Sequence, residues 1–380
     1  MKTNSDTPQK LYLGLDVHKA QTTVAIADPG AGGEVRHHGS VATTHTALER
    51  VVRRIAKAHK IPLDALEVCY EAGGCGMWIA RHFDKIGVPC TVIAPSLIPS
   101  QSGDKVKTDK KDARKLARLH RAGELTAVRV PDETDEAIRD LCRARVDAHD
   151  DLRRARTRVL ALLRRLGIHY PGKTHWTGMH WRFLRNLKLE FPAHRVILEE
   201  GLLQIEQLLE RIERLDTHMV LLCESWANKP VVDALMTFRG FKIVAAMMVV
   251  SEIGDFVRFT HPRQLMSYLG LVPGEYSSGG KQNQTGITKC GNAHARWILI
   301  ECATHYRVQP RVSHAMAERQ KGKPRWIKEI AWRAQNRLHT RFRTLRGRLM
   351  HHNKVKVAVA RELTAFIWEL GVKIQTNAVR

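Results

Sequence analysis

Four carboxylates occupy positions where a folded chain could use them for chemistry. Asp16 lies within an apolar run, and Glu71 ends a second apolar run directly before a Gly-rich turn. Asp109 and Asp112 are spaced i, i+3, which places both on one face at the start of a helix. An ionised carboxylate inside an apolar strand is costly unless it is paired or bound to a cation. Together the four acids predict a Mg²⁺ site, with Mn²⁺ as the alternative, of the two-metal kind that promotes phosphoryl transfer.

Each carboxylate also has a structural explanation of its own. Asp109 could be the N-cap of its helix, with Asp112 at position N3. Glu71 could simply close a strand, and Asp16 could pair with Lys19 or with a buried arginine. The joint placement of all four acids on these elements favours the metal site over four separate explanations.

A second candidate site is the segment 268–303, which contains a Gly-rich loop. Ser277 and Ser278 offer two adjacent hydroxyls, and Lys281 and Lys289 add positive charge. The backbone amides of the two glycines that follow the serines, together with these lysines, could hold a phosphate. A flexible surface turn is the alternative, and it is the better explanation for such a loop taken alone.

Composition restricts the partner and the compartment. The 380 residues include 62 Lys and Arg against 38 Asp and Glu, a net charge of +24, which predicts a polyanionic partner, most often nucleic acid. A ribosome-associated or merely basic protein is the alternative. The seven scattered cysteines form no C-x-x-C pair, so neither a zinc ribbon nor a disulfide framework is indicated. Without an apolar signal core or an apolar run near ~18 residues, we expect a soluble cytoplasmic protein with no membrane segment.

The first 130 residues predict the elements that must position the carboxylates. Three strands come first, and helices and strands then alternate in a β-β-β-α-β-α-β-α order, which is that of an RNase H-like fold. In that fold the first and fourth strands are neighbours and a later helix covers their ends, so the four acids would converge. The predicted strands are 10–17, 22–27, 34–41, 65–70 and 88–94. One helix is predicted to begin at Thr46, and two more are predicted at 77–86 and 109–121.

Beyond residue 130 the pattern becomes helical, which makes the whole chain α/β plus α. We expect a helical, coiled-coil-bearing region at 131–230. Residues 134–166 are helical and rich in Arg, residues 167–192 predict an irregular loop, and apolar residues recur at spacings of three and four between Leu198 and Met219. The two long helices could pack as an antiparallel hairpin or could dimerise.

The last predicted domain, 231–380, is small and mainly helical. It holds the serine loop, a helix that begins near Asn292, and a tail, 321–356, with twelve Lys and Arg against one acid, Glu329. Tryptophans and a phenylalanine interleave with these cations, and such a helix is a candidate for phosphate contacts. A solvated basic face is the alternative.

Three motifs of the first domain resemble those of a known family. GLDVHK at 14–19, YEAGGCG at 70–76 and KTDKKDARKLA at 107–117 are similar to the signatures of the DEDD insertion-sequence transposases. That family includes Piv- and MooV-like DNA invertases and bridge-RNA-guided recombinases. The resemblance implies a RuvC-like N-terminal domain, in agreement with the strand order. It also implies catalytic and metal-binding roles for the four acids, Asp16, Glu71, Asp109 and Asp112.

The resemblance extends to the serine loop, where the family carries a G-L-x-P…S-G…I-[ST]-K-x-G-N block with a serine as DNA nucleophile. The match places that serine at Ser278, with Ser277 as the alternative. A serine hydroxyl needs activation and charge stabilisation. Lys281, Lys289 and Arg296 are the cations that we expect to bind the nucleic acid.

Residues 238–259 resemble the helix–hairpin–helix-like element of the same family, which holds the DNA backbone. The hairpin reads Gly240-Phe241-Lys242, where a second small residue would be more usual. Close approach of a phosphate is therefore in question, and Lys242 could compensate by binding the nucleic acid through its charge.

The resemblance implies DNA strand cleavage and rejoining during insertion, excision or inversion. Ser278 would form a covalent phosphoserine while the acids hold magnesium for the same phosphate, in composite sites shared between protomers of a homodimer or tetramer. The implied partners are the DNA of the element ends and target and, as in some members, a structured guide RNA. Two alternatives stay open: a metal-only nuclease such as a Holliday-junction resolvase, and a non-catalytic nucleic-acid-binding protein.

Overall fold

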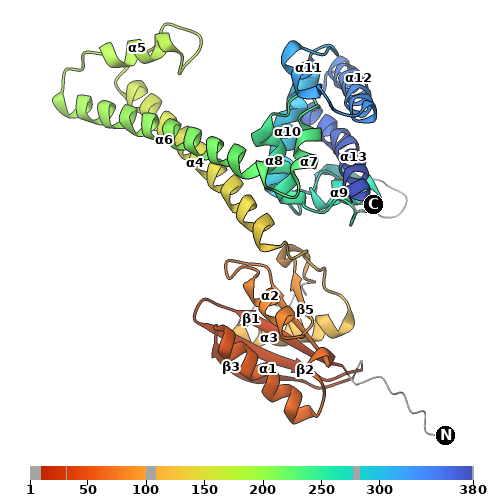
Figure 1. Ribbon diagram of the computed structural model, residues 1–380. Coiled ribbons are helices and arrows are strands. Elements are labelled where there is room, and N and C mark those ends of the chain that lie inside the picture. The colour runs from red at the N-terminus through yellow and green to blue at the C-terminus, as the bar shows by residue number, and fades with distance from the viewer. Residues whose placement is uncertain (1–9, 31, 100–107, 277–282, 379–380) are drawn as a thin grey trace. The chain divides into compact units, whose positions relative to one another are not determined.

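The computed structural model describes residues 10–30, 32–99, 108–276 and 283–378 (Figure 1). The chain divides into two compact units, Met1–Pro131 and Asp132–Arg380, called here the N-terminal unit and the C-terminal unit. None of the helices in the described part of the chain combines the length and the apolar character that a bilayer crossing needs.

The N-terminal unit is built on a mixed five-stranded sheet with the strand order β3-β2-β1-β4-β5. The first three strands are antiparallel neighbours, whereas β4 and β5 run parallel to β1. This mixed α/β architecture, predicted from the sequence, is confirmed and is consistent with an RNase H-like domain. The strands are β1 (Leu11–Val17), β2 (Gln21–Ala27), β3 (Val35–Ala42), β4 (Leu66–Glu71) and β5 (Cys90–Ile93), and the helices are α1 (His45–His59), α2 (Trp78–Lys85) and α3 (Asp109–Ala122), with short 3₁₀ turns at Leu63–Ala65 and Pro95–Leu97.

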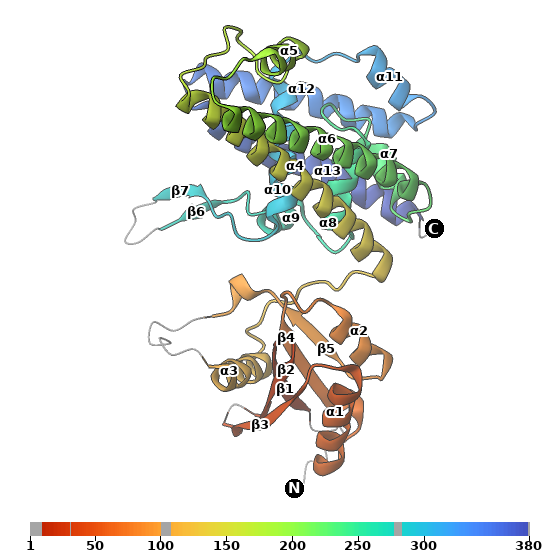
Figure 2. The ribbon, with the colours of Figure 1, turned by 90° about the vertical axis from the view of Figure 1, so that its left-hand side faces the viewer.

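The two faces of the sheet bury different side chains. Figure 2 shows α1 and α2 on one side of the sheet and α3 on the other. Leu13 and Leu15 of β1 belong to the large core under α1 and α2, whereas Ala25 of β2 packs with Ala113 and Ala117 of α3. Because side chains alternate along a strand, the residues of β1 on either side of Leu13, Tyr12 and Gly14, face α3. The small residues on that face let α3 lie close to the strands.

The C-terminal unit begins with two antiparallel helices of 33 residues each, α4 (Glu133–Arg165) and α6 (Pro192–Glu224). Ile138, near the start of α4, shares a core with Met219, near the end of α6, whereas Leu162 and Leu198 share a second core at the opposite ends. Within one chain, the two long helices therefore form a hairpin. The prediction that residues 167–192 are irregular is wrong in part, because they contain the helix α5 (Gly178–Asn186). Apolar residues of α5 pack into the second core, which the local sequence pattern did not reveal.

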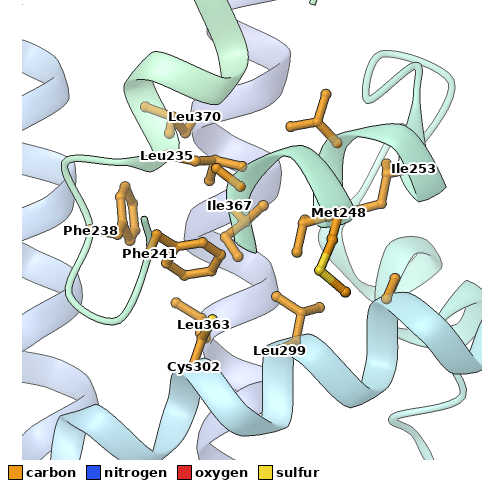
Figure 3. Close-up of a cluster of buried hydrophobic side chains, with 14 of the residues drawn as sticks. Leu235, Phe238, Phe241, Met248, Ile253, Leu299, Cys302, Leu363, Ile367 and Leu370 are labelled. Atoms are coloured by element: carbon orange, nitrogen blue, oxygen red, sulfur yellow. The ribbon is translucent and has the colours of Figure 1, made fainter. Parts of the chain in front are cut away.

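The rest of the C-terminal unit is a helical domain around one large hydrophobic core. Figure 3 shows Phe238, Phe241, Leu299, Leu363 and Ile367, which come from the loop after α7 and from two later helices, together in this core. The helices are α7 (Lys229–Leu235), α8 (Ile243–Ile253), α9 (Pro262–Tyr268), α10 (Ala293–Ala303), α11 (His314–Gln320), α12 (Arg325–Gly347) and α13 (His352–Ala378), with a 3₁₀ turn at Thr304–Arg307 and a two-stranded sheet of β6 (Pro273–Glu275) and β7 (Gln284–Ile287). Asn292 is the N-cap of α10, as the sequence predicts for the start of that helix.

Part of the basic tail is neutralised by the neighbouring helix. Arg333 of α12 pairs with Glu369 of α13 at 2.7 Å, and Arg337 and Arg341 both pair with Glu362 at 2.9 Å. The acids that compensate α12 lie beyond residue 356 and therefore outside the basic stretch 321–356. This face of α12 is therefore a packed ion-pair surface rather than a row of unpaired cations.

Candidate active site

Gly14 brings α3 against the sheet at the point where the carboxylates gather. A Cβ atom at Gly14 would lie 2.3 Å from the carbonyl oxygen of Ala113 and 2.4 Å from the amide nitrogen of Ala117. A residue with a side chain cannot permit that approach unless the helix moves. Asp16 lies on the same face of β1 as Gly14, because side chains alternate. Asp109 lies one turn before Ala113 on α3, so the start of the helix comes over Asp16.

Asp16, His18 and Asp109 form a compact group of potential metal ligands. Nε2 of His18 lies 3.3 Å from Oδ2 of Asp16 and 3.7 Å from Oδ1 of Asp109. One ligand atom from each residue lies within 4.8 Å of the other two. Asp16 is half-buried and the other two are exposed, so the group opens to solvent. The two carboxylates suit Mg²⁺ or Mn²⁺, and the three residues fit one divalent cation.

His18 was not among the residues predicted from the sequence. It follows β1 in a turn, where its amide donates to the Gln21 carbonyl (3.0 Å) and its carbonyl accepts from the Thr43 hydroxyl (2.7 Å). The signal was the spacing, because a residue two positions after Asp16 emerges on the same face of an extended chain. The GLDVHK motif contains His18, but only the four acids predicted the metal site.

The electrostatics around Asp16 favour a bound cation. Burial raises the pKa of the Asp16 carboxyl, His18 lowers it, and the carboxylates of Asp109 and Asp112 raise it again, so the pKa lies above its ordinary value. Like charges gathered at one spot disfavour the ionised form, and an opposite charge relieves them. A divalent cation would supply that charge.

Glu71 ends β4 on the α3 face of the sheet. The parallel pairing of β1 with β4 sets Leu15 opposite Tyr70, so Asp16 and Glu71 are the next positions on the two neighbouring strands. Cys69, two residues before Glu71, donates its thiol to a carbonyl of α3 at 3.7 Å, which fixes the face. Glu71 is exposed and does not belong to the group of three ligands described above. It lies at the same edge of the sheet, one strand away.

The start of α3 removes one alternative explanation of its aspartates. Thr108 is the N-cap, and its hydroxyl accepts from the amide of Lys111 at 3.4 Å. Asp109 is the first helical residue rather than the cap, so the explanation of Asp109 as an N-cap is wrong. Asp112 is half-buried, and its charge acts on Asp16. The charges of both aspartates act on the β1 carboxylate.

In the C-terminal unit, the described residues on either side of the second candidate site, 272–276 and 283–291, form the two sides of an arm. Strands β6 and β7 pair in antiparallel fashion, with Glu275 opposite Gln284. Ser277, Ser278 and Lys281 lie outside the described residues. The structure therefore describes the foot of the arm, where the chain leaves and rejoins the helical domain.

The foot of the arm is closely packed. A Cβ atom at Gly270 would lie 2.2 Å from the carbonyl oxygen of Cys290, and one at Gly291 would lie 2.1 Å from that of Tyr268. Lys289 adopts a left-handed conformation with a φ of 57°, and its amide donates to the Gly270 carbonyl at 3.2 Å. The two ends of the arm are therefore held backbone against backbone.

A buried carboxylate, Glu252 of α8, connects both ends of the arm to α4. Its side chain accepts two hydrogen bonds from Arg143 of α4 (2.8 and 3.0 Å) and one from the Asn292 side chain (2.7 Å). The Tyr268 hydroxyl donates to the Glu252 carbonyl at 3.1 Å. Burial would raise the pKa of Glu252, but the hydrogen bonds from Arg143 and Asn292 and the charge of Arg143 outweigh it and leave the pKa below its ordinary value.

The three described cations that were expected to bind nucleic acid differ in their surroundings. Nη1 of Arg296 donates to the Leu269 carbonyl at 2.9 Å, and burial lowers the pKa of this guanidinium, so Arg296 braces the foot of the arm. Lys289 is exposed at that foot, and Lys242 is exposed at the start of α8. The turn before Lys242 is tight, because a Cβ atom at Gly240 would lie 2.8 Å from a carbonyl oxygen of α10. That glycine therefore faces the protein, and Lys242 is the exposed group of the hairpin.

Two family models match the chain: the first covers most of the N-terminal unit and extends into the C-terminal unit, and the second lies within the C-terminal unit. Residues 13–168 match a DEDD model of the IS110 type, described as a transposase. Residues 232–317 match a model described as the transposase IS116/IS110/IS902 family. The first match contains the carboxylates and the second contains the serine arm.

Curated proteins similar to this chain carry related names. The putative transposase y4qE of Sinorhizobium fredii is 41% identical over 363 residues, which cover 96% of this chain and 89% of that protein. The transposase for insertion sequence element IS1533 of Leptospira borgpetersenii is 29% identical, covering 89% of this chain and 97% of that protein. The transposase for insertion sequence element IS1111A of Coxiella burnetii is 27% identical over 83% of this chain and 79% of that protein.

Proposed function

The chain belongs to the IS116/IS110/IS902 transposase family, and from this premise we propose that it uses a serine nucleophile and a divalent-cation site on DNA. Transposases cleave and rejoin DNA strands, so the overall reaction is phosphoryl transfer on DNA. The observation that carries the proposal is the group of Asp16, His18 and Asp109 at the edge of the sheet.

The proposed cation site uses the acids of the N-terminal unit. Asp16 and Asp109 would hold Mg²⁺ or Mn²⁺ together with His18, and Glu71 and Asp112 would complete the ligands from the same edge of the sheet. When bound, the cation stabilises negative charge on the scissile phosphate. The role of the protein here is to keep the carboxylates together against their mutual repulsion, which the contact between Gly14 and α3 does.

Ser278 is the proposed nucleophile. Its hydroxyl loses a proton, its Oγ forms a bond to the scissile phosphorus, and the bond from phosphorus to a deoxyribose oxygen breaks and leaves a hydroxyl on the released DNA end. Rejoining reverses these steps with the hydroxyl of another DNA end. Lys281 and Lys289 would bind the flanking phosphates, with Lys242 holding the backbone farther along. The clamped foot of the arm supports this assignment, since a nucleophile must be presented in a defined direction.

Serine and acids come from different units of the chain, so we propose composite sites in a homodimer or tetramer, as the family resemblance implies. The DNA of the element ends and the target would be the substrates. A structured guide RNA is part of the proposal because the net charge of +24 suits a large polyanion. Charge does not separate RNA from DNA. Sequencing the nucleic acid that co-purifies with the protein from cells tests for the guide.

Trapping of a covalent intermediate tests the serine assignment. The wild-type protein is incubated with Mg²⁺ and duplex DNA that carries the element ends, and protein–DNA adducts that survive denaturant are measured. Ser277→Ala is the matched control, because it changes the neighbouring hydroxyl. We expect the adduct with the wild type and with Ser277→Ala and its complete loss with Ser278→Ala.

Other results would change the assignment. Loss with Ser277→Ala instead would make Ser277 the nucleophile. Full strand exchange by Ser278→Ala, lost in Asp16→Asn, would leave a metal-only nuclease mechanism. Activity that neither substitution changes, from a low baseline without any Mg²⁺ effect, would indicate a non-catalytic nucleic-acid-binding protein.

A further inference from the structure

The connection between α4 and α6 is unusually basic, and Glu190 near its end is its one acid. From Arg164 to Leu189, called here the tip, there are six Lys and Arg and three His but neither Asp nor Glu. The same stretch contains four aromatic residues, Tyr170, Trp176, Trp181 and Phe183. Basic residues interleaved with aromatic ones are typical of surfaces that bind nucleic acid. The proposed function assigned no role to this segment.

The tip is a folded structure with its own core rather than a loose loop. Trp176, Trp181 and Phe183 pack against the core that contains Leu162 and Leu198, apart from the main core of the unit. The Arg156 guanidinium lies 5.2 Å from the centre of the Trp176 ring, a cation–π contact. The aromatic residues therefore give the tip a packed core that supports the backbone carrying its cations.

The backbone of the tip is strained at its centre. Trp176 has a φ of 64°, a left-handed conformation that a bulky side chain rarely adopts. Its amide donates to Nδ1 of His180 at 3.0 Å, and His180 is completely buried. This buried contact holds the strained turn in place, and strained turns of this kind are concentrated at binding sites.

The cations of the tip are mostly exposed and without acidic partners. Among the described residues of the tip, Arg185 pairs with an acid, Glu206 of α6, at 2.6 Å. Lys173, Arg182 and Lys188 are exposed, and none of them has an acidic partner within reach in the described structure. The contrast with α12 is direct, because three arginines of α12 pair with two glutamates of α13. The positive charge of the tip therefore remains available to a ligand.

We propose that the tip is a nucleic-acid-binding surface that contacts the phosphodiester backbone through Lys173, Arg182 and Lys188. Arg164 and Arg165 add to the same field, although their place at the C-terminal end of α4 also favours cations for local reasons. The proposal does not rest on Ser278 or on the carboxylates, since it concerns binding alone. Helices of 33 residues span about 50 Å at ~1.5 Å per residue, so the contact reaches phosphates far from the helical domain.

Two triple variants of the full-length protein test the proposal. The tip variant is Lys173→Gln/Arg182→Gln/Lys188→Gln, and the control is Arg50→Gln/Arg54→Gln/Lys57→Gln, which removes three exposed cations of α1. Both lower the net charge by the same three units. Binding to a labelled random duplex DNA and to a labelled hairpin RNA is measured over a range of salt concentrations in the presence of EDTA. Thermal unfolding shows whether each variant remains folded.

We expect the tip variant to bind about ten-fold more weakly at low salt. The slope of log affinity against log salt concentration should become shallower by about 2 to 3, because each lost phosphate contact removes ~0.9 from that slope on duplex DNA. The control should change the slope by less than about one. Loss on duplex DNA alone identifies DNA as the ligand, and loss on the hairpin alone identifies RNA. Equal slopes for the two variants would overturn the proposal, as would a tip variant that changes the oligomeric state while nucleic-acid binding is unchanged.

Discussion

The carboxylate edge of the N-terminal unit and the foot of the serine arm hold their residues by different means. At the edge, acids gather next to one another, and burial together with the neighbouring carboxylates raises the pKa of Asp16. At the foot, the acid Glu252 is surrounded by donors, and its pKa is lowered. A carboxylate with unfavourable neighbours needs an added cation, whereas one with satisfied hydrogen bonds already has its partners. The first arrangement suits the cation site proposed above, whereas the second is that of a structural clamp.

Asp16→Asn gives the sharpest test of this difference. We expect strand cleavage in Mg²⁺ to fall by about 10³-fold, because the cation loses a central ligand. Stability without metal should stay equal or rise, because the substitution removes one of three neighbouring negative charges. Cleavage rates and urea unfolding in EDTA measure the two effects. Asp84→Asn, on the exposed surface of α2, is the control and should change neither.

Gly14→Ala tests whether packing holds the carboxylates together. The added Cβ would lie 2.3 to 2.4 Å from backbone atoms of α3, which cannot move aside as a flexible side chain can. We expect a loss of about 3 kcal/mol in the free energy of unfolding, typical of overpacking, and weaker Mg²⁺ binding because Asp109 moves with α3. Gly32→Ala is the matched control, since its Cβ would meet nothing within 4 Å. Unchanged Mg²⁺ affinity in Gly14→Ala would show that α3 does not position the acids.

The sequence predicted the N-terminal elements because each is marked locally. Alternating apolar residues and short turns placed every strand of the sheet within two residues of its observed ends. The convergence of Asp16 with Asp109 followed from that strand order. The alternative in which Asp109 is the N-cap arose because Thr108 and Asp109 are both good capping residues, and sequence spacing does not choose between neighbours.

The features that the sequence did not predict depend on pairs of residues far apart in the chain. Glu252 pairs with Arg143, 109 positions earlier, and with Asn292, 40 positions later. The charge of α12 is compensated by Glu362 and Glu369 of the next helix. No periodicity reports such contacts, because each partner looks like an ordinary surface residue in its own segment.

Glu252→Gln tests the clamp. The amide keeps the shape but removes the charge that Arg143 needs, and we expect a loss of about 2 kcal/mol in the free energy of unfolding, moderated because the Arg143 side chain is 40% exposed. Adduct formation through the arm should fall, while Mg²⁺ binding to the N-terminal unit should not change. Glu301→Gln, exposed on α10, is the control. A drop in Mg²⁺ affinity in Glu252→Gln would mean that the two sites are not independently built.

Acid pH should weaken the clamp by a smaller amount, on the order of 1 kcal/mol near pH 4. Because the folded-state pKa of Glu252 is lowered, its contribution is fully present above the ordinary pKa of about 4.5 and is lost as pH falls through the folded-state value. The charges of Arg143 and His294 both favour the ionised carboxylate, so the loss is confined to acid conditions. Urea unfolding of the wild type and of Glu252→Gln from pH 7 to pH 3.5 should show the difference between them shrinking toward zero. A difference that stays constant with pH would mean that the clamp acts through packing rather than charge. The clamp and the carboxylate edge would then differ in how their side chains pack and not in how their carboxylates are charged.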